Sequence, residues 1–61
     1  RPDKVILYRD KTVVIDFKTG EKQDKYGKQI TNYANLLAEM NYPNIEKYLL
    51  YTKDKSVEQI S

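Results

Sequence analysis

The stretch VVIDFKTGEK, residues 13–22, decides how this chain is organised. Its apolar first half has the length and β-branched content of a strand, and successive strand residues point to opposite faces. One face of this strand is wholly apolar and consists of Val13, Ile15 and Phe17. The other face turns polar at Asp16 and Lys18. The strand can therefore contribute to a core along most of its length and present charged groups at its end.

The neighbouring segments predict the remaining elements. KVILYR indicates a strand over about residues 4–9, followed by the strand over 13–18. Asp24 is a suitable helix N-cap, and the helix over about 25–41 is stopped by Asn41 and Pro43. EKYLLYT predicts a strand over about 46–52, inside the sheet because it is apolar on both faces, and SVEQI a short final strand over 56–60.

This order, ββαβ(β), predicts an α/β (α+β) fold: a β-hairpin, a crossover helix, and a following strand parallel to the second. We expect one mixed sheet with one covering helix, in a single domain over residues 1–61. Apolar residues at helical spacing predict the helix face that packs on the sheet, the alternative being a binding surface. These residues are Tyr26, Ile30, Tyr33, Leu37 and Met40.

Composition excludes several kinds of chemistry. The chain has no cysteine and no histidine, which excludes disulfides, zinc sites built from thiolates or imidazoles, and Ser-His or Cys-His catalytic pairs. Any catalysis must rest on carboxylates, lysines, tyrosines and a metal ion. Eleven Lys and Arg against nine Asp and Glu permit contact with nucleic acid without requiring it. No membrane-length apolar run is visible.

The hairpin predicts a charged cluster. If its turn is centred on Asp10 and Lys11, paired residues have numbers that sum to 21, so Asp3 lies opposite Lys18 and Val5 opposite Asp16. Asp3, Asp16 and Lys18 would then share one face. An odd-numbered loop or a bulge would instead place Asp3 on the opposite face. The bland alternative is an exposed surface ion pair beside an acid near the chain terminus.

With these segments taken together, RPDKVIL, TVVIDFKTGEK and KQITNY, the chain resembles the PD-(D/E)xK nuclease superfamily. The narrower resemblance is to the RecB-like exonuclease module at the C-terminal ends of bacterial helicase-nucleases. It covers Arg1 to about Thr52. It implies a restriction-endonuclease-like core that is truncated on its N-terminal side, because the family has a helix with a further acid ahead of the first aspartate.

The resemblance also implies roles for single residues. Asp3 and Asp16 would bind the metal together with the backbone carbonyl of Phe17, and Lys18 would position or activate the attacking water. The Q-x-x-x-Y element, Gln29 and Tyr33, would support the site and the DNA path. Mg²⁺ suits these oxygen ligands, with Mn²⁺ as a substitute, because it supplies a nucleophile at neutral pH and neutralises phosphate charge.

Three lysines follow the strand and could contact DNA phosphates, the alternative being a solvated face. They are Lys22, Lys25 and Lys28. TGEK lacks the leading glycine and spacing of a P-loop, so we expect no ATP site in this chain.

The expected function is that of the catalytic core of a Mg²⁺-dependent DNA exonuclease, from a helicase-nuclease or DNA repair protein of the bacterial cytoplasm. Its partners would be DNA and the helicase region of the same parent chain or complex. The isolated chain is expected to cleave poorly and to expose a surface that invites self-association. The alternatives are a non-catalytic module for DNA docking or protein contact, and a related restriction-type endonuclease.

Overall fold

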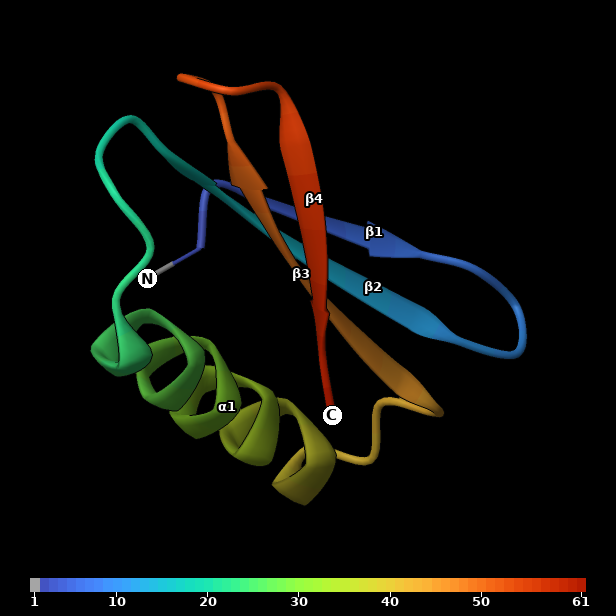
Figure 1. The fold of residues 1–61 in the computed structure, drawn as a ribbon. Helices are drawn as coiled ribbons and strands as arrows, with labels where there is room; N and C mark the ends of the chain where they lie inside the picture. Colours follow the sequence, from blue (N-terminus) through green and yellow to red (C-terminus); the bar gives the residue numbers. More distant parts are fainter. Residues whose placement is uncertain (1) are drawn as a thin grey trace.

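The computed structural model describes residues 2–61 and contains a four-stranded sheet with one helix on one face (Figure 1). The elements, in chain order, are β1 (Lys4–Leu7), β2 (Thr12–Lys18), α1 (Asp24–Glu39), β3 (Ile45–Tyr51) and β4 (Ser56–Ile60). The spatial order is β1-β2-β3-β4, with β2 and β3 parallel and the outer pairs antiparallel. The predicted mixed sheet with one covering helix is therefore confirmed.

The element ends differ from the predicted ones by one or two residues. Strand β1 stops at Leu7 because the chain turns at once towards β2, and helix α1 ends at Glu39. At the start of α1 the prediction that Asp24 is the N-cap is wrong. Gln23 takes the cap position in an extended conformation and makes no capping hydrogen bond, while Asp24 lies in the first turn. There its negative charge still interacts favourably with the positive end of the helix dipole.

The predicted register of the β1–β2 hairpin is also wrong, by two residues. Val5 pairs with Val14, not with Asp16, so the numbers of paired residues sum to 19. The Tyr8 N–H donates to the Lys11 carbonyl at 2.9 Å, which centres the turn on Arg9 and Asp10.

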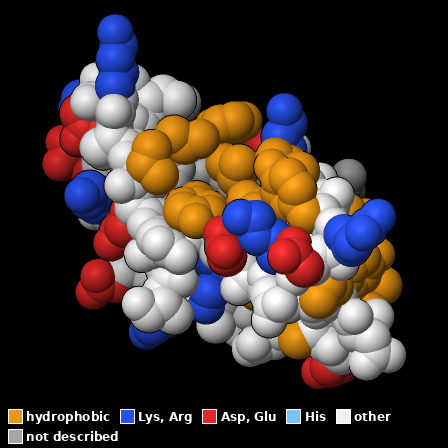
Figure 2. Space-filling model, turned by 90° about the vertical axis from the view of Figure 1, so that its right-hand side faces the viewer, with side chains coloured by type: hydrophobic (Ala, Val, Ile, Leu, Met, Phe, Trp, Pro, Cys, Tyr) orange, Lys and Arg blue, Asp and Glu red, His pale blue; other side chains and the backbone are white. Residues whose placement is uncertain are grey.

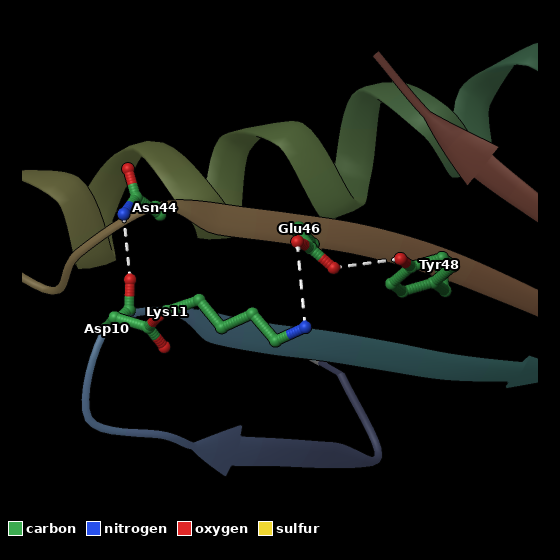
Figure 3. Close-up of polar contacts among 5 residues, drawn as sticks. All are labelled: Asp10, Lys11, Asn44, Glu46 and Tyr48. Atoms are coloured by element: carbon green, nitrogen blue, oxygen red, sulfur yellow. Dashed lines mark hydrogen bonds and ion pairs between the residues drawn. The ribbon is translucent and has the colours of Figure 1, made fainter.

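This turn is held by hydrogen bonds with Asn44, the residue just before β3. The Asn44 side-chain amide donates to the Asp10 carbonyl at 2.7 Å, as Figure 3 shows, and the Thr12 N–H donates to the Asn44 carbonyl at 3.3 Å. These bonds fix the turn from a segment far along the chain. Because the shift is an even number of residues, every β1 side chain keeps its predicted face.

The core lies between α1 and the face of the sheet that carries Val14. Ile30 and Leu37 of the helix pack there against Leu49 and Tyr51 of β3, and all are buried. Ala34 is buried as well, whereas the predicted core residue Met40 is 64% exposed. Met40 is the C-cap, one residue past the end of α1, so the helical spacing no longer determines where its side chain points.

The end of α1 follows from Asn41. This residue has a φ of 69°, in the left-handed region that asparagine tolerates better than most residues. The Asn41 N–H donates to the Ala38 carbonyl at 3.0 Å, and the Tyr42 N–H donates to the Leu37 carbonyl at 3.2 Å. This pair of bonds is a Schellman motif, which satisfies the last carbonyls and turns the chain towards β3.

The other face of the sheet has no helix over it. Its apolar side chains include Val13, Ile15, Phe17, Leu50 and Val57, with Phe17 45% and Val57 60% exposed. Figure 2 shows hydrophobic side chains gathered around a few charged groups on the side of the molecule seen there. The predicted tendency to self-associate rests on this uncovered face and stays a prediction.

Three polar side chains on the uncovered face contact one another. The Lys11 ammonium lies 3.9 Å from the Glu46 carboxylate, and the Tyr48 hydroxyl donates to the other Glu46 oxygen at 2.9 Å (Figure 3). The hydrogen bond to Glu46 is the main cause that raises the pKa of Tyr48 above its ordinary value.

No helix in residues 2–61 is long and apolar enough to cross a membrane.

Leu49→Ala should lower the free energy of unfolding by about 2–5 kcal/mol, because it leaves a cavity in a well-packed core. Leu49 is 1% exposed, whereas Leu36, on the outer side of α1, is 57% exposed and provides the matched control. Urea unfolding followed by circular dichroism measures both variants. Equal losses for Leu49→Ala and Leu36→Ala would contradict this packing.

Candidate functional site

An ion pair closes the C-terminal end of β2. The Lys18 ammonium lies 2.9 Å from an Asp16 carboxylate oxygen, and the side chains are only 20% and 14% exposed. Because residues two apart on a strand share a face, both groups lie on the side of the sheet that α1 covers. They stand in line with buried Val14, at the point where the helix begins to cover the sheet.

Asp3 joins this pair from the start of β1. Its carboxylate accepts a hydrogen bond from the Phe17 N–H at 2.8 Å. Continued by one residue, the hairpin register sets Asp3 beside Asp16, rather than opposite Lys18 as predicted. The Phe17 N–H is the main cause that lowers the pKa of Asp3, followed by the neighbouring Asp16 carboxyl. Desolvation opposes these two effects, and the Lys18 charge adds a smaller lowering.

The backbone of Phe17 faces the same corner. In a strand the N–H and C=O of one residue point to the same side. The Lys18 carbonyl accepts from the Thr52 N–H at 2.9 Å, on the β3 side, so both polar groups of Phe17 point towards β1. Asp3 takes the N–H. The Phe17 carbonyl oxygen is thus directed to the β1 side of β2, from which Asp3 approaches.

Tyr26 also lies at this site, although its place in the apolar stripe predicted a core residue first and a binding surface only as the alternative. Its ring centre lies 4.3 Å from the Lys18 ammonium, within the range of a cation–π contact. Its hydroxyl accepts a hydrogen bond from the Gln23 side chain at 3.1 Å. One feature of the sequence could have predicted this contact. A helix that starts six residues after Lys18 must bring its first turn over the end of β2.

Gln29 and Tyr33 lie farther along α1. Gln29 is exposed, and Tyr33 is half-buried against the hydrophobic core. Among the described residues, no hydrogen bond joins either one to Asp3, Asp16 or Lys18. The structure therefore brings together the three charged residues and Phe17, and it leaves the Q-x-x-x-Y element outside this group.

The three lysines after β2 are exposed and make separate contacts. The Lys22 ammonium lies 5.6 Å from the ring centre of Tyr51, and the Lys25 ammonium 5.8 Å from that of Tyr26. Lys22 and Tyr51 line a pocket of about 280 Å³ between the start of α1 and β4. Burial, and secondly the nearby Glu58 charge, raises the pKa of Tyr51. Lys28 borders a separate hollow beside Thr31.

The oxygen atoms at this corner are of the kind that magnesium takes as ligands. Mg²⁺ is usually held by one or two carboxylates, keeps several waters and takes further ligands from substrate phosphates. Asp3 and Asp16 would supply the carboxylates, with the Phe17 carbonyl on the side of β2 from which Asp3 approaches. Within residues 2–61 no group of three acidic residues could hold a metal ion, so the ligand set is small.

No family model, no curated protein and no solved structure matches this chain.

The lowered pKa of Asp3 predicts a pH dependence. The folded chain favours the carboxylate, so Asp3 contributes stability that is fully present above the unfolded-state pKa, 3.8, and is lost as the pH falls through the lower folded-state value. Thermal melts of the chain between neutral pH and the acid range should show this loss. In Asp3→Asn the same acid range should cost less stability, since the titrating group is gone.

The carboxyl carbon of Asp3, followed by NMR, gives the pKa directly. A midpoint at or above 3.8 would contradict the bond between Asp3 and Phe17.

Proposed function

We propose that this chain forms the catalytic core of a Mg²⁺-dependent DNA exonuclease of the RecB-like type, within the PD-(D/E)xK superfamily. The observation that carries the proposal is the group at the end of β2. Asp3 is hydrogen-bonded to the Phe17 N–H at 2.8 Å, and Lys18 is paired with Asp16 at 2.9 Å. The reaction would be hydrolysis of phosphodiester bonds in DNA.

The chemistry of this group suits that reaction. A bound Mg²⁺ supplies a nucleophilic water at neutral pH and charge neutralisation at the phosphate. Asp3 and Asp16 would hold the ion with the Phe17 carbonyl. Lys18, held 2.9 Å from Asp16, would orient the attacking water and stabilise negative charge that develops on the phosphate oxygens. No histidine is needed for any of these roles.

The arrangement of elements supports the same proposal. A hairpin, a crossover helix and a strand parallel to the second hairpin strand make up the order that the family resemblance implies. The uncovered apolar face of the sheet is compatible with further structure packing there in an intact nuclease.

DNA and a helicase region are the partners we propose. Lys22 and Lys25 lie next to the end of β2 and would contact backbone phosphates, and Lys28 would do so farther along α1. Gln29 and Tyr33 would support the DNA path along the helix.

Metal binding by the chain itself is the first test. Adding Mn²⁺ should broaden the NMR signals of Asp3, Asp16 and Phe17 before those of other acidic segments, because paramagnetic broadening falls steeply with distance. Mg²⁺ should compete and restore these signals. Asp16→Asn should abolish the selective effect.

Glu21→Gln is the matched control, since Glu21 is an acid in an exposed ion pair with Lys53 at 3.4 Å. This variant should leave the selective broadening intact. Broadening of all acidic segments alike, or none at the end of β2, would argue for a non-catalytic module that docks DNA or a protein.

DNA cleavage is the second test. In the intact nuclease to which we assign this chain, Lys18→Ala should lower kcat by about 10²–10³-fold, and Asp16→Ala by at least as much, because each removes charge stabilisation used in the reaction. Lys53→Ala, which breaks an exposed ion pair of the same kind, should retain the rate. Full activity of both site variants in a DNA degradation assay would refute the proposal.

A further inference from the structure

We infer that Tyr26 is the positioning residue for Lys18: its ring face holds the lysine ammonium at the end of β2 when the charge of Asp16 is shared with a metal ion. This inference rests on the proposed function for its place in a reaction. The contact itself is a property of the chain and can be tested without any cleavage assay.

Two different interactions hold the Lys18 ammonium. On one side lies an Asp16 oxygen at 2.9 Å, and on the other the Tyr26 ring, with its centre at 4.3 Å. Lysines usually extend into water, yet this side chain is only 20% exposed. The ammonium is therefore placed from two sides, by a carboxylate on its own strand and by an aromatic ring on the helix.

The two interactions respond differently to a cation. If Asp16 held a metal ion, much of its carboxylate charge would be neutralised, so its attraction for the Lys18 ammonium would be weaker and the cation would repel the ammonium. The ring quadrupole of Tyr26 carries no net charge and takes no part in metal binding. The ring contact consequently remains when the ion pair is weakened, and it keeps Lys18 beside the site instead of letting it extend into solvent.

The ring is fixed by its own surroundings. Tyr26 lies in the first turn of α1 and packs against the hydrophobic core. Its N–H donates to the Gln23 carbonyl at 3.1 Å, and its hydroxyl accepts from the Gln23 side chain at the same distance. A ring held by core packing and by Gln23 can position a flexible lysine, whereas a free aromatic side chain could not.

The direct test is NMR of the chain without metal. An ammonium above a ring face places its neighbouring methylene protons in the shielding region of the ring, so the Lys18 Cε protons should resonate upfield of those of exposed Lys53. Cross-relaxation between these protons and the Tyr26 ring should be visible in the wild-type chain. Its absence would overturn the inference without any variant.

Variants separate the ring from the carboxylate. In Asp16→Asn, which removes the charge as a bound cation would, the upfield shift of Lys18 should persist. Tyr26→Phe should also retain it, while Tyr26→Leu should return the Lys18 signals to the value of Lys53. If the shift is lost in Asp16→Asn, Asp16 alone positions the lysine and the inference is wrong.

Lys25→Gln is the matched control, because Lys25 approaches the same ring at 5.8 Å without contacting Asp16 in an ion pair. It should leave the Lys18 shift unchanged. The amide signals of Val14 and Leu49 report whether each variant is folded. A Tyr26→Leu variant that is folded and keeps the upfield shift would refute the positioning role.

Kinetics of the intact nuclease connect the contact to the reaction. Tyr26→Leu should lower kcat about tenfold to a hundredfold with little change in KM or in the Mg²⁺ concentration that gives half-maximal rate, because a displaced catalytic group acts on the transition state. Tyr26→Phe should restore the rate. If Mn²⁺ fails to bind at Asp3 and Asp16 but the Lys18 shift behaves as described, the proposed function fails and the contact stands.

Discussion

The parallel pairing of β2 and β3 is the constraint on which the rest of this structure depends. Parallel neighbours cannot be joined by a tight turn, so the chain between them must cross over the sheet, and α1 is that crossover. The helix covers one face and creates the buried contact between Ile30, Leu37 and Leu49. With so short a chain, this one layer of contacts has to supply most of the stability.

The same pairing gathers the ends of the strands at one edge. Lys18 pairs with Tyr51 at this edge. The chain leaves β2 after Lys18, and the first turn of α1 brings it back over the same edge. Groups from β2, from the start of the helix and from the end of β3 therefore meet without a long loop. The start of β1 adds Asp3 from the far side of β2, since an antiparallel partner begins where β2 ends.

Periodicity in the sequence was sufficient for the order of the elements and for the face that each strand residue occupies. The helical stripe through Ile30 and Leu37 reports burial directly, whereas the alternation in β2 does not, because its wholly apolar face is the one that no helix covers. Periodicity could not set the hairpin register, because Arg9, Asp10 and Lys11 carry no strong turn preference and the side-chain bond that holds the turn comes from Asn44, 34 residues away. The prediction that Met40 is a core residue was wrong for a related reason, since the helical spacing of apolar residues does not say where the helix ends.

The candidate site was predictable to the same degree. Asp3 could be assigned to the Asp16 face despite the wrong partner, because an even shift in register preserves the face. Its bond to the Phe17 N–H depends on the bend at Asp3, which strand alternation does not describe. The contact of Tyr26 with Lys18 was not predicted, because an aromatic residue in an apolar stripe also satisfies the core pattern. Only the structure shows that the Lys18 ammonium lies over its ring.

The charged end of β2 is stable because the helix side chains that face it change from aliphatic to aromatic at the same point. Where β2 carries Val14, α1 presents aliphatic side chains, and where β2 carries Lys18, the first turn presents the aromatic ring of Tyr26. An aliphatic side chain there would leave the ammonium without an attractive partner on that side, whereas the ring accepts it. The strand can therefore continue under the helix after its residues become polar, and two of the charged groups remain largely shielded from solvent. Such shielding strengthens their electrostatic interactions, which is what a site for phosphate chemistry requires.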